Sequence, residues 1–512
     1  MRVTQALVRA ATVNGRGIGT IDGDRVHRWD EVSSRVARIA GGLHARGVAP
    51  GDRVAILSHN SDRYFDAFFA VPWAGAVLVP LNTRLARAEL DFQLRDAGVR
   101  LLLHGAEFAE TAAWLKAEGA VTALLAMDGD APDALDALAE AAPPAAEAEQ
   151  DAGELAGIFY TGGTTGLPKG VMLSHANLHV TASNLMMVIP FDDDCVNFHA
   201  APMFHLADIG ILFCTMAGGT HVFSRGFDAA TILNAIARYK VTHCFTVPAV
   251  IDRMAKSELA DRLDLSSLRM LGYGGSSMPA ANYAFARSRF PHVGFIQGFG
   301  QTEMPAATYL SPRAHREAPA EKLASAGKVC FGYEIRIVDE DGNEVPRGTV
   351  GEIVGRGGNV MLGYWNRPEE TAEVLRDGWV HTRDAGYMDE DGYIYVTDRL
   401  KDMIVSGAEN VYSQEVENAL SWHPAIEEAA VIGVPDEIWG ERVHAVIVLK
   451  QGAEAPALKD VAAFCRDYIA GYKCPKSMEI RELPLPRSAA GKILKGPLRE
   501  AVDGSGPAPA PR

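Results

Sequence analysis

Residues 160–170 combine glycine, threonine and lysine in a pattern that could bind a polyphosphate. The stretch reads YTGGTTGLPKG, and an apolar run, residues 155–160, leads into it. Glycine lets a backbone approach a bulky anion and turn its N–H groups toward it. Threonine hydroxyls add donors and can ligate a hard cation, and Lys169 supplies positive charge. A plain surface turn rarely needs these threonines and a lysine among its glycines, so we interpret the stretch as a phosphate-binding loop.

This loop is not that of the P-loop nucleoside triphosphatases. Their pattern, G-x-x-x-x-G-K-[ST], places Gly directly before Lys and Ser or Thr directly after it. Here Pro168 precedes Lys169 and Gly170 follows it, so the register fails. The sequence therefore indicates a different way of holding a nucleotide.

A second stretch, QGFGQTE at residues 297–303, could complete the site. A carboxylate beside a polyphosphate would repel it unless the carboxylate holds Mg²⁺, which prefers one or two carboxylates together with phosphate oxygens. Glu303 fits that role, Thr302 could donate to the α-phosphate, and Phe299 offers a flat face for adenine. Alone, the stretch would more often be a loop with an exposed glutamate. Beside the glycine-rich loop, the magnesium interpretation is favoured.

Two further stretches carry charge at informative places. Asp384 follows a strand-like run, residues 378–381. There an ionised carboxylate, which only accepts hydrogen bonds, could receive both ribose hydroxyls, although a plain turn aspartate is an equal alternative. Residues 398–402, DRLKD, are by themselves typical of a solvated charge run. They lie, however, where the pattern of strand-like and helix-like segments changes, which makes them a candidate hinge.

Composition narrows the class of protein. The chain has 512 residues, a hydrophobic content of 48% and a net charge of −16, which argues against nucleic-acid binding and requires local Lys, Arg and Mg²⁺ around a polyanion. Its six cysteines show no CxxC spacing, so neither a zinc site nor a disulfide framework is suggested, and a reducing cytoplasm fits. We find no signal peptide and no apolar run of membrane-spanning length, and peripheral membrane contact stays open.

The first half of the chain alternates strand-like and helix-like segments. Short apolar runs at 54–57 and 76–80 flank a helix-like segment, 63–71, which predicts βαβ units and a largely parallel sheet. Asp30 is a candidate cap for a helix with apolar Val32, Val36, Ile39 and Leu43. The Ala-, Glu- and Pro-rich segment 131–151 is interpreted as a variable surface connection. Further strands at 241–247, 268–273 and 293–297 run into small-residue loops, and in an open α/β sheet such loops form the ligand crevice.

The second half has a different texture. Beyond about residue 325 the pattern is more antiparallel, and beyond residue 399 it resembles a small α+β unit. We expect an α/β protein: a large N-terminal domain of α/β subdomains plus a β-rich portion, with a small mobile α+β C-terminal domain. At this length at least two domains are expected. The predicted divisions are 1–398 for the large domain, 399–402 for the hinge, 403–502 for the small domain and 503–512 for a disordered tail.

Residues 160–170 resemble the phosphate-binding signature of the adenylate-forming enzymes, the group of acyl-CoA synthetases, peptide-synthetase adenylation domains and luciferases. That signature is usually Y-T-S-G-T-T-G-x-P-K-G, and Gly162 here replaces its Ser. Other family patterns follow in order, each with a departure or a match: Y-G-x-T-E with Phe299 for Tyr, T-G-D with Arg383 for Gly, S-G-G-E-N with Ala408 for Gly, and P-R-x-x-x-G-K-[IV] at residues 486–493. The resemblance covers about residues 20–500.

The resemblance implies three catalytic positions. Lys492 would meet the carboxylate and the α-phosphate, Lys401 would be the hinge about which the small domain turns, and His205 would gate the acyl pocket with Phe204 without transferring a proton. A lone His in an apolar segment is otherwise most often a satisfied core residue. Lys495 is interpreted as a surface residue. The expected ATP contacts are Thr161, Gly162, Gly163, Thr164, Thr165, Gly166, Lys169, Gly274, Gln297, Gly298, Phe299, Thr302, Asp384 and Arg399. Metal contacts would come from Glu303 and Thr161, the acyl pocket from Phe204, His205, Met278 and Met304, and coenzyme A contacts from Gly407 and Ala408.

The function implied is an ATP-dependent acid–CoA ligase in the cytoplasm, a monomer or homodimer, with Mg²⁺, ATP and coenzyme A as cofactor and substrates. It would activate a carboxylic acid, a medium- or long-chain fatty acid or an aryl acid, as acyl-AMP. One alternative delivers the acyl group to a carrier protein or another acceptor, and another is a nucleotide-binding protein without catalysis. Amino-acid activation is disfavoured because the segment beginning at Phe204 lacks the Asp that pairs a substrate α-amine in those relatives.

Overall fold

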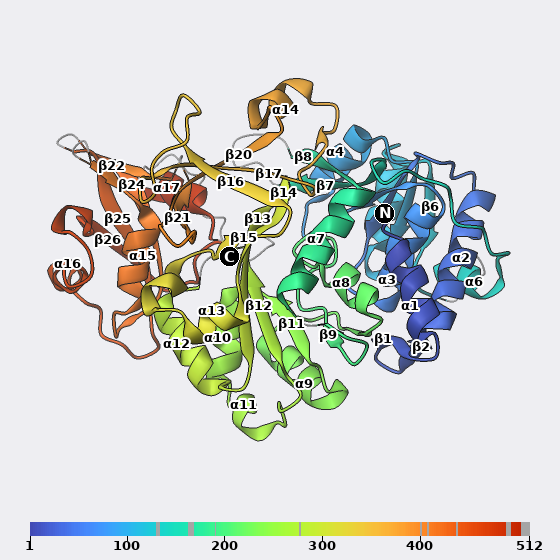
Figure 1. The fold of residues 1–512 in the computed structure, drawn as a ribbon, viewed down its shortest axis with the longest axis horizontal. Coiled ribbons are helices and arrows are strands. Elements are labelled where there is room, and N and C mark those ends of the chain that lie inside the picture. Colours follow the sequence, from blue (N-terminus) through green and yellow to red (C-terminus); the bar gives the residue numbers. More distant parts are fainter. Residues whose placement is uncertain are drawn as a thin grey trace.

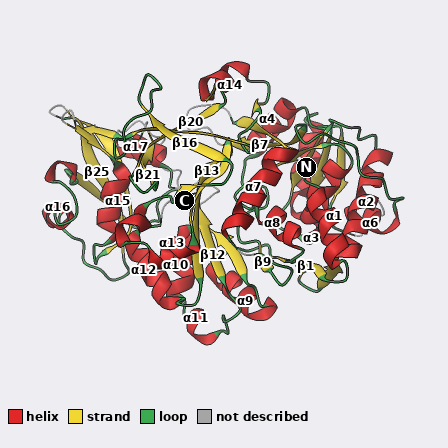
Figure 2. Cartoon of the chain, in the orientation of Figure 1, coloured by secondary structure: helices red, strands yellow, loops and turns green. Residues whose placement is uncertain are grey.

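The computed structural model describes residues 1–129, 134–161, 168–189, 191–275, 278–399, 402–406, 409–436, 439–487 and 493–502. Within them the strands form four sheets, which Figures 1 and 2 show with their covering helices. The helices are α1 (Gln5–Asn14), α2 (Trp29–Ala45), α3 (Asp62–Trp73), α4 (Arg87–Ala97), α5 (Ala109–Ala117), α6 (Leu135–Ala141), α7 (His175–Val188), α8 (Gly210–Ala217), α9 (Ala229–Tyr239), α10 (Pro248–Lys256), α11 (Leu259–Arg262), α12 (Ala280–Arg289), α13 (Pro312–Glu317), α14 (Pro368–Val374), α15 (Ser413–Ser421), α16 (Leu458–Cys465) and α17 (Lys495–Val502).

A seven-stranded sheet carries the ends of the phosphate-binding loop. Its order is β18-β8-β7-β4-β3-β5-β6, and β7, β4, β3, β5 and β6 pair in parallel while β8 and β18 are antiparallel to their neighbours. The predicted βαβ unit is confirmed as β3, α3 and β4. The bounds are β3 (Arg53–Leu57), β4 (Val77–Pro80), β5 (Leu101–His104), β6 (Ala123–Ala126), β7 (Leu155–Thr161), β8 (Lys169–Ser174) and β18 (Gly363–Tyr364).

A nine-stranded sheet carries the second stretch, residues 297–303. Its order is β15-β14-β13-β12-β11-β9-β10-β1-β2. The predicted strands at 241–247, 268–273 and 293–297 are β11, β12 and β13, three parallel neighbours whose carboxyl ends lie together. The bounds are β1 (Ile18–Asp22), β2 (Arg25–Arg28), β9 (Val196–Phe198), β10 (Thr220–Phe223), β11 (His243–Thr246), β12 (Met270–Gly274), β13 (Gly294–Gln301), β14 (Met304–Leu310) and β15 (Lys328–Val329).

Two smaller sheets make up the second half, as the change of texture predicts. The antiparallel one contains β16 (Tyr333–Val338), β17 (Gly351–Gly357), β19 (Leu375–Arg376), β20 (Trp379–Met388) and β21 (Ile394–Arg399). The last contains β22 (Ile404–Ser406), β23 (Glu409–Val411), β24 (Ile426–Asp436), β25 (Gly440–Leu449) and β26 (Ser477–Arg481) and lies with α15 and α16 at the left of Figure 1. The predicted fold class, a large α/β domain with a β-rich portion and a small α+β unit, is confirmed. The residue-level divisions and the mobility of the small unit stay predictions, and residues 503–512 fall outside the described part.

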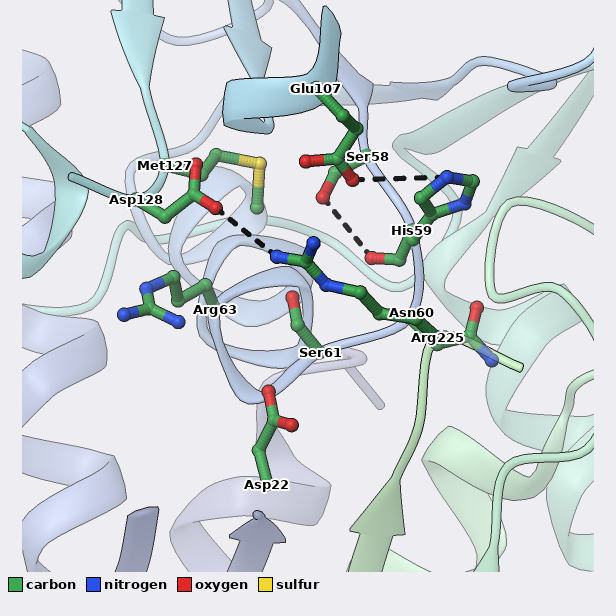
Figure 3. A pocket seen from close by; sticks show the side chains of 10 residues that line it. All are labelled: Asp22, Ser58, His59, Asn60, Ser61, Arg63, Glu107, Met127, Asp128 and Arg225. Carbon is green, nitrogen blue, oxygen red and sulfur yellow. Dashed lines mark hydrogen bonds and ion pairs between the residues drawn. The ribbon is translucent and has the colours of Figure 1, made fainter. Parts of the chain in front are cut away.

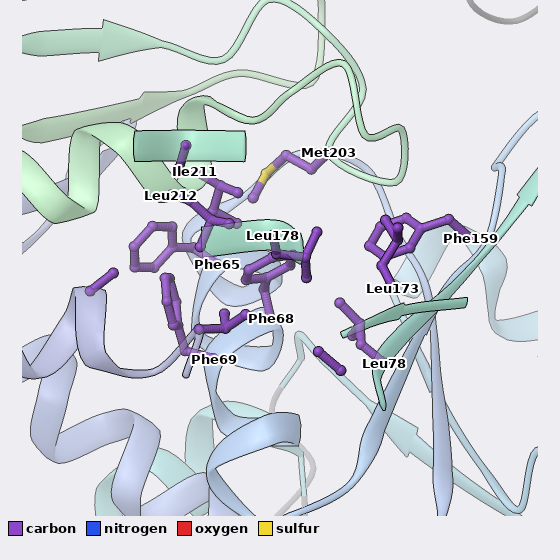
Figure 4. Close-up of a cluster of buried hydrophobic side chains, with 14 of the residues drawn as sticks. Phe65, Phe68, Phe69, Leu78, Phe159, Leu173, Leu178, Met203, Ile211 and Leu212 are labelled. Carbon is purple, nitrogen blue, oxygen red and sulfur yellow. The ribbon is translucent and has the colours of Figure 1, made fainter. Parts of the chain in front are cut away.

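The largest hydrophobic cluster joins the two large sheets. Aromatic side chains of α3 meet apolar side chains of α7 and α8 there, and Met203 lies beside them (Figure 4). Phe65 and Phe69 are fully buried, and their rings lie 5.0 Å apart in a tilted arrangement. Because the segment with Met203 leads into Phe204 and His205, this cluster positions one candidate part of the site. No helix in the described residues is long and apolar enough to cross a membrane.

Two local predictions in the first 150 residues are wrong. Helix α2 buries the predicted apolar positions, but its N-cap is Arg28, so Asp30 lies inside the first turn, where its charge favours the helix dipole. Segment 131–151 is not a variable surface connection, because its described part contains α6, which packs on α2. A Cβ on Gly42 would lie 2.8 Å from Leu138 of α6, so α2 needs glycine at this close approach. The alanine and glutamate content that indicated a linker also favours helix.

Candidate active site

The hairpin of β7 and β8 holds the two ends of the predicted phosphate loop. Thr161 pairs with Lys169 across the hairpin, and the Thr161 hydroxyl donates to the Lys169 carbonyl at 3.5 Å. Residues 162–167, which include the predicted Gly162, Gly163, Thr164, Thr165 and Gly166, fall outside the described part. The described ends place Thr161 and Lys169 side by side at the mouth of that loop.

Asp96 of α4 ties this hairpin to its surroundings. The Tyr160 hydroxyl donates to its carboxylate at 2.7 Å, and the Arg367 guanidinium pairs with the other oxygen at 2.7 Å. Trp365 donates its ring N–H to the Asp96 carbonyl at 3.0 Å, and its backbone N–H donates to Gly170 at 2.8 Å. Both strands of the hairpin are thus fixed from one point. Sequence reasoning missed Asp96, because a polar residue on an amphipathic helix carries no distinguishing signal.

Lys169 and Glu303 meet on one tyrosine. The Lys169 ammonium lies 5.1 Å from the centre of the Tyr364 ring, and the Tyr364 hydroxyl donates to the Glu303 carboxylate at 2.8 Å. Burial and the neighbouring Glu303 raise the pKa of Tyr364 well above its usual value, so its hydroxyl stays protonated. The structure therefore brings together two predicted residues that are more than a hundred positions apart in the sequence. Tyr364, which connects them, was not predicted.

Gln301 connects the second stretch to Asp384. Its side-chain amide donates to the Asp384 carboxylate and to the Thr382 carbonyl, both at 2.8 Å. Asp384 is buried, and β20 pairs with β21 so that Asp384 lies opposite Arg399. The Arg399 side chain is outside the description. Gln301 lay within a predicted stretch but had no predicted role, and its two bonds now join the nine-stranded sheet to the antiparallel sheet.

Arg383 keeps a backbone conformation that favours glycine. Its φ is +59°, in the left-handed region that costs a non-glycine residue about 1–2 kcal/mol. Its backbone N–H donates to Glu352 at 2.9 Å, and its guanidinium pairs with Glu373 at 3.1 Å on the surface. The replacement of the usual glycine therefore leaves the backbone before Asp384, inside β20, in the same region of conformation.

The glycines at the ends of β12 and β13 lie close together. Gly274 pairs with Gly298, and a Cβ on Gly274 would lie 2.9 Å from the Gly298 carbonyl oxygen. Gln297 is buried directly before them, Phe299 is half-buried against the largest core cluster, and Thr302 and Glu303 are half-buried in the turn between β13 and β14. Backbone and glycine thus meet closely at the strand ends where the sequence predicts a ligand crevice.

The segment 202–208 carries Phe204 and His205, both half-buried. The Ala207 N–H donates to His205 Nδ1 at 3.1 Å, so that nitrogen carries no proton. Phe204 lines a cavity of about 130 Å³. The other predicted pocket residues lie deeper: Met278 is buried, and Met304 is fully buried with its sulfur against Gly355 of β17.

A second cavity of about 130 Å³ adjoins the first at the loop before α3 (Figure 3). The two cavities share Ser58, His59, Asn60 and Arg225. The second is lined by charges of both signs, and Arg225 pairs with Asp128 at 3.6 Å. No predicted ATP-binding residue in the described part of the chain lines it, so it is separate from the cluster of Lys169, Glu303 and Tyr364.

Several predictions for the C-terminal unit fall outside the described residues, namely Lys492, Lys401, Gly407 and Ala408. One prediction there is wrong. Lys495 is not a surface residue, because its ammonium pairs with Glu417 at 2.8 Å, contacts the Ser413 hydroxyl, and its side chain is only 14% exposed. Burial alone would lower the pKa of Lys495, but Glu417 and Asp398 raise it above the usual value. Lys495 thus stabilises the start of α15.

Glu303 suits an Mg²⁺ ion that takes some of its oxygens from a bound phosphate. Within the described ranges no group of three or more His, Cys, Asp or Glu side chains could enclose a metal ion. A single carboxylate fits Mg²⁺ because this ion takes its remaining oxygens from phosphates and water. The Thr161 hydroxyl at the end of β7 stays a predicted second ligand. The residues present are therefore compatible with the metal that the chemistry requires.

Comparison with known proteins identifies the class to which this fold and cluster belong. Residues 6–365 match the model of the AMP-binding enzyme family, and residues 415–492 match that of the AMP-binding enzyme C-terminal domain. The chain belongs to this family of adenylate-forming, AMP-forming acid–thiol ligases, and the predicted resemblance is confirmed.

Individual relatives extend over nearly the whole chain. A feruloyl-CoA synthase from Amycolatopsis sp is 43% identical over 496 residues, covering 96% of this chain and 97% of the relative. The fatty acid–acyl-carrier-protein ligase ScoC of Streptomyces coeruleorubidus is 35% identical over 492 residues, covering 93% and 92%. Among solved structures, ATP-bound MatB from Rhodopseudomonas palustris is similar with a TM-score of 0.90 at 31% identity, covering 99% of this chain and 100% of that one.

Proposed function

We propose that this protein is an ATP-dependent acid–CoA ligase acting on an aryl acid or a medium- or long-chain fatty acid. The observation that carries the proposal is the cluster in which Lys169 and Glu303 meet on Tyr364 while Gln301 holds Asp384. Those residues come from three separate stretches, each predicted to contact a different part of ATP. An ordinary core would have no reason to collect a lysine at the start of β8, a glutamate between β13 and β14 and a buried aspartate within β20.

The first half-reaction joins the acid to AMP. A carboxylate oxygen forms a bond to the α-phosphorus of ATP, the bond to the bridging oxygen breaks, and pyrophosphate leaves. Such an in-line displacement is catalysed mainly by positioning and charge neutralisation. Lys169 and Lys492 would supply positive charge, and Asp384 would accept the ribose hydroxyls. Mg²⁺, when bound through Glu303 and Thr161, would neutralise phosphate charge.

The second half-reaction transfers the acyl group to a thiol. The small domain would turn about Lys401 and withdraw Lys492, and the loop with Gly407 and Ala408 would line the path of coenzyme A. The thiolate sulfur attacks the acyl carbonyl, a thioester forms and AMP leaves. Large and small domains at 1–398 and 403–502, joined by a hinge at 399–402, suit this alternation. We place the enzyme in the cytoplasm, where ATP and coenzyme A are available.

Two observations bear on acid and acceptor. The 43% identity to a feruloyl-CoA synthase and the half-buried Phe204 support an aryl acid as the first candidate. The 35% identity to a ligase that loads fatty acids onto a carrier protein supports a phosphopantetheine thiol on a protein as the alternative acceptor.

The test is pyrophosphate release with a panel of acids: ferulate, benzoate, decanoate, palmitate and acetate. We expect pyrophosphate release that depends on one class of acid in the panel. Coenzyme A thiol should be consumed in an amount equal to the AMP formed. Acid-dependent release without thiol consumption would transfer the proposal to a carrier-protein acceptor. ATP binding without release for any acid would establish instead a nucleotide-binding protein without catalysis.

A further inference from the structure

Four buried side chains form a polar chain behind the segment 202–208. His199 Nδ1 lies 2.6 Å from Asp208 Oδ2, His199 Nε2 lies 2.9 Å from His221 Nδ1, and His221 Nε2 lies 3.0 Å from the Thr215 hydroxyl. His199, His221 and Thr215 are fully buried and Asp208 is 5% exposed. The aromatic rings of Trp29, Phe65 and Phe223 pack against the two imidazoles. The proposed chemistry uses none of these four groups.

The direction of each hydrogen bond in this chain follows from its far end. Thr215 donates its hydroxyl proton to the Ile211 carbonyl, so its oxygen accepts from His221 Nε2. Burial holds the pKa of His221 well below its usual value, so this ring is neutral and its Nδ1 accepts from His199 Nε2. A single proton then lies between His199 Nδ1 and Asp208 Oδ2. Every donor and acceptor in this chain has a partner only if the side chain of residue 208 bonds to His199 Nδ1.

Asp208 ends a segment that is anchored at both sides. At its start, Asn60 accepts from the Met203 N–H at 2.8 Å and donates to the His199 and Ala201 carbonyls at 3.1 and 2.8 Å. At its end, the Asp208 N–H donates to the His205 carbonyl at 2.9 Å while the Asp208 side chain is held by His199. Phe204 and His205 lie between these anchors.

We propose that Asp208 is a positioning residue for the acyl pocket: its bond to His199 fixes the turn that carries Phe204 and His205. This inference rests on the proposed function, in which those two side chains wall the pocket. Asp208 is 5% exposed, and its Oδ1 and Asn197 Nδ2 of β9 both lie next to Gly210 at the start of α8, so it acts through the turn and not by touching the acid. The hydrogen bond between Asp208 and His199, and not packing alone, therefore fixes the position of the pocket wall.

The test compares Asp208→Ala with Asp208→Asn. Alanine removes the partner of His199, whereas the asparagine amide can donate to His199 Nδ1 and preserve the whole chain. We expect Asp208→Ala to raise KM for the best acid of the panel by about ten- to hundredfold, the range for losing a charge-assisted hydrogen bond, and KM for ATP by less than about threefold. Asp208→Asn should keep KM for the acid within about threefold of wild type.

A second readout needs no substrate. Amide hydrogen exchange of residues 203–208 should quicken at least about tenfold in Asp208→Ala and stay near wild type in Asp208→Asn, because the alanine side chain no longer ties the end of this segment to His199. Slow exchange in Asp208→Ala would overturn the proposal even if no acid of the panel were activated. Fast exchange together with an inactive wild-type enzyme would instead count against the proposed function alone.

Val222 provides the matched control. It is fully buried beside His221 on β10 but packs in a different core cluster, with Ile232 and Leu233. Val222→Ala should destabilise the same sheet and leave KM for the acid unchanged. An equal rise of KM in Val222→Ala would show that Asp208→Ala acts through general loss of stability, and equal defects in Asp208→Ala and Asp208→Asn would show that charge matters instead of the bond. Either result would refute the proposal.

Discussion

Glu303→Gln separates the negative charge of this carboxylate from the hydrogen bond that it accepts from Tyr364. In the structure Glu303 accepts a hydrogen bond from Tyr364 at 2.8 Å, and a glutamine oxygen can accept the same bond. The substitution therefore keeps the geometry of the cluster and removes only the negative charge. If that charge holds Mg²⁺, we expect kcat for pyrophosphate release to fall by about 10²- to 10³-fold, the scale for removing one preorganised electrostatic contact. The Mg²⁺ concentration at half-maximal rate should rise by about tenfold or more, since one of few protein ligands is lost.

Tyr364→Phe is the matched control for this prediction. It removes the hydrogen bond but keeps the charge of Glu303 and the ring beneath the Lys169 ammonium. We expect the unfolding free energy to fall by about 1.5 kcal/mol and the half-saturating Mg²⁺ concentration to stay within about threefold. Both quantities come from urea unfolding and from Mg²⁺ titrations of pyrophosphate release at saturating ATP. A wild-type Mg²⁺ titration in Glu303→Gln would refute the assignment of the metal to this carboxylate.

Three further substitutions test other parts of the site. Lys492→Ala should lower adenylation by more than about 10²-fold and spare conversion of supplied acyl-adenylate with coenzyme A, and an equal fall in both half-reactions would contradict the two-conformation scheme. Lys401→Pro should impair thioester formation more than adenylation, because proline fixes φ at the proposed hinge, and equal activities would exclude that hinge. Arg383→Gly should raise the unfolding free energy by about 0.5–1 kcal/mol, since relief of the left-handed cost exceeds the extra entropy of unfolded glycine. A loss of stability in urea unfolding would show that the lost Glu373 ion pair, together with the glycine entropy, outweighs the relief of the left-handed cost.

The fold and the closeness of several candidate nucleotide-binding residues could be predicted because each has a local cause. Apolar runs at 54–57 and 76–80 became neighbouring strands β3 and β4, and the runs before Gly274 and Gly298 became β12 and β13. Carboxyl ends of parallel strands meet at one edge of a sheet, so glycine-rich loops at those ends had to lie together.

What could not be predicted depends on partners distant in sequence. Asp96 acquires its role only because Tyr160 and Arg367 fold against it. Lys495 lies close after Gly491, in a segment typical of surface charge, and only Glu417 shows that its side chain is mostly withdrawn from solvent in an ion pair. In each case the sequence displays the residue type but not the partner, and for a charged side chain the partner decides between surface and interior.

Departures from a family pattern need to be judged on backbone geometry, not on residue type. Arg383 replaces a glycine, which suggests a different backbone conformation, yet its φ of +59° is one that glycine adopts freely. Two features hold it there: the Glu352 carboxylate accepts a hydrogen bond from the Arg383 N–H, and the Gln301 amide fixes the carboxylate of the next residue, Asp384. The surroundings therefore over-determine the backbone at this point of β20, and strain of this kind persists at sites where a neighbouring side chain must be aimed. That the chain retains a strained residue directly before Asp384 is itself an argument that the position of the Asp384 carboxylate matters for function.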